Sequence, residues 1–325
     1  MFRLNSKIAI GDFQFTTVVD SEIQTSWDMF TDLSTIVMPT NLKNKSLSLI
    51  DNINRGDAVK MELGYFPTLV TEFEGYVFDV VPENPIKIKC QDSMYLLKQQ
   101  RIRNYFKKNV TVKQLLEDLG LSDYNTVDAN LGTIKINNAN IVEVLETLKE
   151  TYGLYPFYRD NVLNVGLVSN FDGITKVFYF NGDNANIITN SLKYQKSNSY
   201  ILGIKGTSIK ADNSRIELYA SYDDNNKIVV SETETENTSR AFTYYDIDKA
   251  QLETNLRENL PKFIYTGYYG SFETFLAPSM QHGDKVTLRD LKYPERDGTY
   301  LIKSIVKKFG NNGGRQVIEL DRRVS

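Results

Sequence analysis

The chain has 325 residues, of which 41% are hydrophobic and 24% are charged, so it can bury a sizeable core. A single hydrophobic core stops growing at roughly 250 to 300 residues, and we therefore expect two or more folding units. The formal net charge of −3 comes from nearly equal numbers of acidic and basic residues. This balance gives no sequence-wide reason to expect binding to nucleic acid or to an anionic membrane.

The single cysteine and single histidine restrict the chemistry that the chain can perform. Cys90 has no second cysteine for an intrachain disulfide, and His282 alone cannot build a histidine-rich metal site. A nucleophile with a histidine base would have to use His282, which lies in a loop before a predicted strand. We interpret His282 as an ordinary loop residue. We predict that the chain is not an enzyme and has no catalytic, cofactor-binding or metal-binding residues. Paired carboxylates for glycoside hydrolysis can lie far apart in sequence, so the single cysteine and histidine do not decide this class of enzyme.

The N-terminus lacks an apolar stretch followed by a cleavage site, and no segment approaches ~18 apolar residues. We therefore expect neither secretion by a signal peptide nor a membrane span.

Residues 1–90 are predicted to be mainly β-strand. Phe13–Val19 alternates in part between apolar and polar residues. After a turn signal, residues 56–65 alternate apolar and charged side chains and precede a second strand over residues 70–81. Gly75 interrupts this second strand, which indicates a bulge or a close approach of two backbones. The pattern predicts one antiparallel ladder, and residues 1–90 are expected to form a first domain, a β-barrel.

Residues 91–168 change to helical spacing and are predicted to form an inserted α+β module. A short helix is expected from Met94 through Arg103. A second helix is expected over Thr111–Gly120, with an N-cap threonine and a C-terminal glycine. A third is expected between the cap Asn140 and Gly153, and a strand pair follows over Tyr155–Val165.

Residues 169–325 are predicted to form a second β-barrel with a helix-containing insertion around residues 207–265. Asp248 can cap a helix over Lys249–Leu260, and Pro261 is expected to mark its end. Short strands separated by Asn, Asp, Gly and Ser turns are expected at Lys176–Phe180, Ser191–Tyr194, Tyr200–Lys205, Arg215–Ser221, Lys227–Val230, Gly267–Leu276, Lys285–Arg289, Gly298–Phe309 and Arg315–Arg322.

Two segments between these elements carry candidate binding residues. In the acidic stretch 231–239, Glu232, Glu234 and Glu236 alternate and could bind a metal, but a solvated loop is the favoured interpretation. The glycine-rich residues 310–314 join two strands instead of opening a helix, so they are predicted to be a hairpin loop and not a phosphate site.

The densest group of aromatic residues comprises Tyr265, Tyr268, Tyr269 and Phe272. These side chains could stack on sugars or bases. Packing in a strand core or at a subunit interface is the simpler interpretation.

Two segments far apart in the chain resemble each other. Residues 56–63 and 283–289 share a Gly-Asp-x-Val start followed by alternation, and each precedes a glycine-led strand, over 75–81 and 298–306 respectively. Two similar β-barrels would explain this similarity. An accidental likeness of two β-hairpins is the alternative.

Residues 283–288, 295–304 and 315–320 resemble the C-terminal end of phage baseplate hub proteins. Residues 53–98, which include Gly56-Asp57 and the segment Ile86–Lys98, resemble the first barrel and following junction of the late-control D-type hub family. The resemblance covers both ends of the chain, whereas the middle is similar mainly in pattern.

The resemblance implies a mainly β fold with α+β insertions, in which two tail-tube-like β-barrels are joined by smaller α/β modules. It further implies a homotrimer that forms a ring between the tail tube protein and a spike or tail-tip protein, with a tape-measure protein as a further candidate partner in the lumen. No membrane is expected as a partner, and DNA would only pass through. The expected location is the tail or baseplate of a virion, assembled in the bacterial cytoplasm. Contractile injection systems share this architecture.

Two alternatives remain open from the sequence. A tail-associated carbohydrate-degrading enzyme would need a cleft with two carboxylates roughly 5 to 10 Å apart. A glycan-binding module would need an exposed aromatic platform in a groove.

Overall fold

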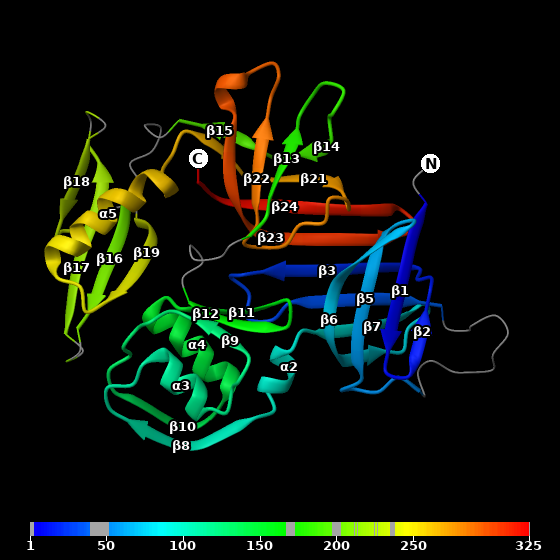
Figure 1. Cartoon of the computed structure of the whole chain (residues 1–325), viewed down its shortest axis with the longest axis horizontal. Helices are drawn as coiled ribbons and strands as arrows, with labels where there is room; N and C mark the ends of the chain where they lie inside the picture. The colour runs from blue at the N-terminus through cyan, green and yellow to red at the C-terminus, as the bar shows by residue number, and fades with distance from the viewer. Residues whose placement is uncertain are drawn as a thin grey trace.

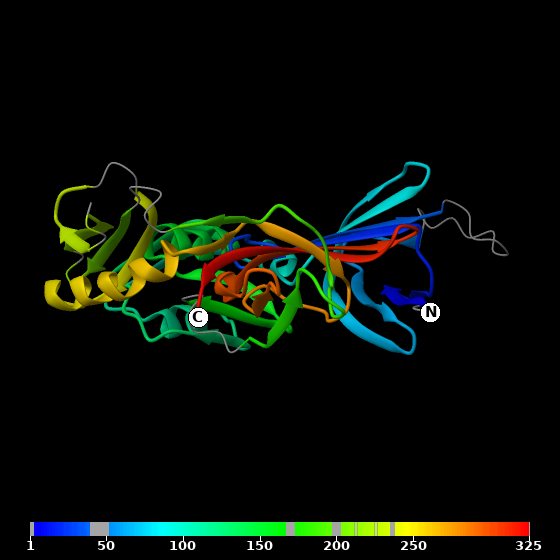
Figure 2. The same cartoon turned by 90° about the horizontal axis from the view of Figure 1, so that it is seen from above.

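The computed structural model describes residues 3–39, 52–166, 173–196 and 203–324, except 211, 213, 224, 226 and 235–237. The chain is mainly β, as the sequence predicts, and helices α2 to α5 belong to two smaller units beside a large sheet (Figure 1). Seen from above, these parts form a long and rather flat molecule (Figure 2).

The N-terminal half contributes seven antiparallel strands to the large sheet. Their order across the sheet is β3 (Asp20–Ser26), β4 (Leu33–Met38), β7 (Ile86–Gln91), β6 (Thr68–Val81), β5 (Ala58–Tyr65), β1 (Leu4–Ile10) and β2 (Phe13–Phe15). Alternate residues of these strands are buried, including Ile8, Ile36 and Ile88. The predicted close approach at Gly75 is confirmed, because a Cβ atom there would lie 2.1 Å from the carbonyl oxygen of Gln91.

The C-terminal half contributes the other strands of the large sheet. They are β14 (Ile187–Asn190), β21 (Ser271–Phe275), β24 (Gly313–Arg323), β23 (Gly298–Gly310), β22 (Lys285–Arg289) and β13 (Thr175–Tyr179). Two short strands, β15 (Lys193–Gln195) and β20 (Gly267–Tyr269), pair with each other and continue the lines of β14 and β21. Phe178, Phe272 and Tyr300 fill the core of this half.

Five strands repeat in the two halves with the same order along the chain and across the sheet. The order β3-β4-β7-β6-β5 corresponds to β14-β21-β24-β23-β22. The Gly56 N–H donates to the Val77 carbonyl oxygen at 2.8 Å, and the Gly283 N–H donates to the Ile302 carbonyl oxygen at 3.0 Å. The register then shifts directly after Val77 and directly after Ile302. The similarity of the two Gly-Asp segments therefore reflects one structural unit built twice.

The two halves join edge to edge in one 13-stranded sheet. Strand β3 of the first half pairs with β23 of the second half, from Ser26↔Ser304 to Asp20↔Gly310. The sequence predicts two barrels but not this joint, because a pairing between residues nearly 300 positions apart has no local signal.

The α+β module follows β7. Its elements are α2 (Met94–Leu97), β8 (Arg101–Lys107), α3 (Val112–Asp118), β9 (Tyr124–Thr126), β10 (Ile134–Asn140), α4 (Ile141–Tyr152), β11 (Tyr155–Arg159) and β12 (Val162–Gly166). Thr111 and Asn140 each form a capping box, and Gly153 ends α4 in the left-handed conformation, so these predicted helix ends are confirmed.

The prediction of a helix through Arg103 is wrong. The helix ends at Leu97, and Arg101 already starts β8, which pairs with β10 over Arg101–Lys107. This pairing supplies the backbone hydrogen bonds that a continued helix would otherwise provide.

The second insertion is a four-stranded sheet with one helix across it (Figure 1). Its elements are β16 (Gly203–Ile209), β17 (Arg215–Tyr222), β18 (Ile228–Ser231), β19 (Thr238–Tyr245) and α5 (Lys249–Phe263). The first residues of the predicted strand Tyr200–Lys205 lie outside the described part of the chain. Helix α5 continues past Pro261, so the predicted end is wrong. Leu256 and Leu260 are fully buried in this unit, and their packing outweighs the helix-ending tendency of the proline. In the described part of the chain, no helix is long and apolar enough to cross a membrane.

Candidate functional site

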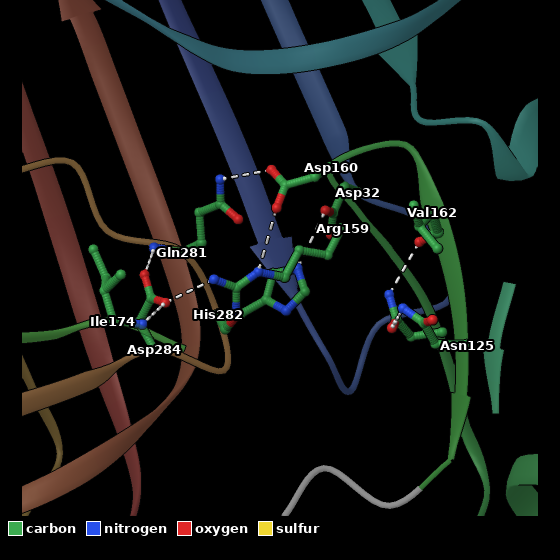
Figure 3. Close-up of polar contacts among 10 residues, drawn as sticks. Asp32, Asn125, Arg159, Asp160, Val162, Ile174, Gln281, His282 and Asp284 are labelled. Atoms are coloured by element: carbon green, nitrogen blue, oxygen red, sulfur yellow. Dashed lines mark hydrogen bonds and ion pairs between the residues drawn. The ribbon is translucent and has the colours of Figure 1, made fainter. Parts of the chain in front are cut away.

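A buried polar junction lies where the two halves of the large sheet meet the α+β module (Figure 3). Its centre is Asp284, whose side chain is 1% exposed. One carboxylate oxygen accepts from the Arg159 guanidinium at 2.8 Å and from the Ile174 N–H at 3.0 Å, and the other accepts from the Gln281 N–H at 2.8 Å. Arg159 also donates to the His282 carbonyl oxygen at 3.1 Å. These bonds fasten β11 of the module to the Gly-Asp turn before β22.

His282 lies in the turn before β22, as the sequence predicts, and it is buried within this junction. Its side chain is 4% exposed, its ring meets the edge of Phe157 at 5.1 Å between centroids, and its Nε2 is 3.6 Å from Asp32 Oδ2. Its Nδ1 has no hydrogen-bond partner among the described residues. We therefore assign His282 to the junction itself, where its ring contacts Phe157 of β11 and lies beside Asp32 of the β3–β4 loop.

A pair of carboxyl groups, Asp32 and Asp92, links the β3–β4 loop to α2, and Asp32 is the one that lies beside His282. The Asp92 side chain accepts from the Asp32 N–H at 3.1 Å and from the Met94 N–H at 3.0 Å. Burial, together with the negative charge of Asp32, raises the pKa of Asp92 well above its usual value. Asp32 in turn accepts from the Ser26 N–H at 3.1 Å. The pair orients the β3–β4 loop against the start of α2.

The same β3–β4 loop binds helix α4. Lys149 donates to the Asp28 carbonyl oxygen at 2.6 Å and lies 3.1 Å from the Asp28 carboxylate. Trp27 is 3% exposed and meets Tyr155 edge to face at 5.0 Å. The loop is therefore fixed to the module by an ion pair and by an aromatic contact.

A second buried link joins the two halves of the large sheet. Glu72 of β6 and Lys307 of β23 form an ion pair whose side chains are 2% and 5% exposed. Ser279 donates to Glu72 at 2.9 Å and accepts from Lys307 at 2.9 Å. Because a charge of this kind is costly to bury without its partner, the pair couples the register of β6 to that of β23.

The aromatic group Tyr265, Tyr268, Tyr269 and Phe272 belongs to the core of the second half. Tyr265 and Tyr269 stack at 4.5 Å between ring centroids, and Tyr265 and Phe272 are 5% and 1% exposed. The hydroxyl of Tyr265 donates to the Tyr268 carbonyl oxygen at 3.1 Å. Packing, and not a stacking platform for sugars, is therefore the role of this group.

The other candidates from the sequence are not brought together. Glu232 pairs with Lys249, Glu234 is exposed, and Glu236 lies outside the described residues. Within the described ranges, no cluster of His, Cys, Asp and Glu could hold a metal ion. Cys90 belongs to the hydrophobic core of the first half, and this burial raises the pKa of its thiol to about 12.

We compared this architecture with known proteins. No family model matches the chain, and no curated protein matches it. Solved structures do match over nearly the whole chain. A tail protein from Neisseria meningitidis has a TM-score of 0.60 at 14% identity and covers 98% of this chain and 96% of its own. The fold is that of phage tail proteins.

Two further structures agree with this assignment. A 43 kDa tail protein of prophage MuSo2 from Shewanella oneidensis has a TM-score of 0.60 at 16% identity, with 98% of each chain covered. A type VI secretion system component from E. coli has a TM-score of 0.57 at 9% identity and covers 97% of this chain and 76% of its own. The tail fold is thus shared by phage and secretion machines.

No pattern in the sequence predicts the residues that join the parts of this tail-protein fold. Arg159, Glu72 and Lys307 are ordinary charged residues in strands, and no motif marks them. Of these joining residues, only Asp284 lies in a sequence pattern, the repeated Gly-Asp segment.

Proposed function

We propose that the chain is the hub subunit of a phage tail or baseplate, of the late-control D type, and that three copies form a ring between the tail tube protein and a spike or tail-tip protein. The observation that carries this proposal is the five-strand unit built twice and joined edge to edge by β3 and β23. Three chains would present six similar faces, which lets a three-fold spike meet a six-fold tube with few mismatched contacts.

The tail fold of the solved relatives supports this role. The E. coli secretion component is itself structurally similar to tail proteins gp27 and gp5 of bacteriophage T4. A Francisella complex of PdpA and VgrG, whose matching chain has a TM-score of 0.50 at 12% identity, covers 99% of this chain and 58% of its own. A spike-like partner is consistent with these neighbours, and a contractile injection system would use the same subunit.

We propose a structural role without catalysis. The buried polar groups of the junction hold strands and loops together, and the aromatic group that could have bound a glycan is packed in the core. The ring would be part of the virion tail, assembled in the bacterial cytoplasm, with a tape-measure protein as a candidate in its lumen and DNA only passing through.

Electron microscopy of the purified protein tests the ring directly. We expect annular particles with six similar lobes, two for each chain. A field of separate elongated particles, with the flat shape of the single chain, would contradict the proposal.

A further inference from the structure

The internal repeat leaves one pairing unmatched. In the joint within the chain, the first-half strand β3 pairs with the end of β23. The equivalent of β3 in the second half is the line β14–β15, and the equivalent of the end of β23 is the end of β6. Among the described residues, β14 and β15 pair with other strands on one side only. No described strand pairs with Asp79–Val81 except β7.

The repeat also fixes the register of the missing joint. Val80 of β6 and Ile305 of β23 lie at the same position after the bulge that both strands share. They pair with Ile88 and Ile318, so Ile88 and Ile318 are equivalent. From Ile88, the paired residues are followed through β4 to β3, and from Ile318 they are followed through β21 to the line β14–β15. This makes Ser26 equivalent to Gln195. Along β23 and β6, the residues that follow the bulge make Ser304 equivalent to Asp79. The observed pair Ser26↔Ser304 then predicts the pairs Gln195↔Asp79, Tyr194↔Val80 and Lys193↔Val81.

The side chains suit this register. Lys193 would lie diagonally across from Asp79 on the same face of the sheet, and Glu83 follows just past the end of β6. Lys193 is exposed, and the Asp79 and Glu83 side chains are 42% and 55% exposed. Tyr194 would lie opposite the apolar Val80. Opposite charges and apolar pairs across strands each contribute roughly 0.2–1 kcal/mol.

An unpaired strand edge with exposed N–H and C=O groups is a template for another chain. Thr189, Asn190 and Ser191 are exposed along this edge. We propose that the β14–β15 edge of one copy pairs with Asp79–Val81 of a second copy, in antiparallel fashion and in the register given above. The joint between copies repeats the joint within the chain. It is head-to-tail, so it closes into a ring or continues as a filament. This inference rests on the proposed function and specifies the surfaces that form the ring.

Disulfide trapping tests the joint in the full chain. The double variant Asp79→Cys and Gln195→Cys is oxidised at the protein concentration at which assembly is measured, and the chains are separated on a denaturing, non-reducing gel. The matched control is Glu22→Cys with Lys308→Cys, an exposed pair that faces across the joint within the chain. The control is expected to form a disulfide within one chain. The joint variant is expected to yield two-chain and three-chain species.

The outcomes separate the joint from the ring. Three-chain species without longer ones support both. A ladder that continues beyond three chains supports the joint and contradicts the ring. A trimeric mass without cross-links between chains, while the control cross-links, overturns the joint and leaves the ring. A single-chain mass without cross-links overturns both.

A surface substitution provides a second test that leaves the fold intact. Lys193→Glu is expected to raise the concentration of half-assembly by at least about threefold, because it places like charges across each joint. Lys113→Glu, in α3 with a side chain 69% exposed, is the control that should leave assembly unchanged. Equal assembly of the two variants would contradict the proposed register.

Discussion

Substitution of Lys307 by methionine is the most informative test of how the two halves are held together. The change keeps a long side chain but leaves Glu72 buried without its cation, since the two side chains are only 5% and 2% exposed. One carboxylate oxygen of Glu72 has no hydrogen-bond partner among the described residues. Without the Lys307 cation, the Ser279 hydroxyl would be the one remaining described partner of the Glu72 carboxylate. Removal of one partner of a buried ion pair typically costs about 3–5 kcal/mol.

This loss can be expressed as a change in melting temperature. An unfolding entropy of roughly 2.1 cal/mol/K per residue gives about 0.7 kcal/mol/K for 325 residues. The expected loss then lowers the melting temperature by about 4–7 °C, measured by differential scanning calorimetry at neutral pH. The double variant Glu72→Leu with Lys307→Met is expected to recover most of the loss, because it removes both buried charges.

The neighbouring residue supplies the control. Lys308 follows Lys307 on β23, and its exposed side chain lies 3.6 Å from Glu22. Lys308→Met should change the melting temperature little, since an exposed ion pair contributes little. Equal shifts for Lys307→Met and Lys308→Met, or no recovery in the double variant, would refute the assignment of Glu72 and Lys307 as a buried coupling.

The junction and the core carry three further predictions. Gly75→Ala should lower the melting temperature, because the added Cβ would lie 2.1 Å from the Gln91 carbonyl oxygen and separate β6 from β7; an unchanged temperature would contradict the close approach. Cys90 should react slowly with a thiol reagent at pH 8 in the folded protein and rapidly after unfolding, because burial raises its pKa to about 12; rapid reaction of the folded protein would contradict its burial. The raised pKa of Asp92 means that the folded state holds a proton that the unfolded state has lost, so this group destabilises the fold as the pH rises above the ordinary carboxyl value. The melting temperature of Asp92→Asn relative to the unaltered protein should therefore increase between pH 4 and pH 7, and a constant or falling difference would contradict a buried neutral carboxyl.

The sequence predicts those elements whose signals are local. The helices after Thr111 and Asn140 are correct, because cap, spacing and C-terminal glycine all lie within one short segment. Arg101–Arg103 is predicted as helix but forms a strand, since its pairing partners in β10, Ala139 and Asn140, come nearly 40 positions later. Pro261 is predicted to end a helix, whereas packing of the helix on its sheet carries it to Phe263.

The functional surfaces are predicted less well than the elements. The repeated Gly-Asp segments do indicate a duplicated unit, because each needs the same turn before the same strand. The β3–β23 joint, the Arg159–Asp284 contact and the Glu72–Lys307 pair all depend on which distant strands become neighbours. Such contacts are set by the tertiary fold and have no pattern along the chain.

The mass of the protein in solution tests the central claim most directly. Sedimentation equilibrium over a wide concentration range should show a species of three times 37.2 kDa, about 112 kDa, that persists on dilution until the joints dissociate. A mass of 37.2 kDa at every concentration would contradict a subunit that forms the ring by pairing with copies of itself.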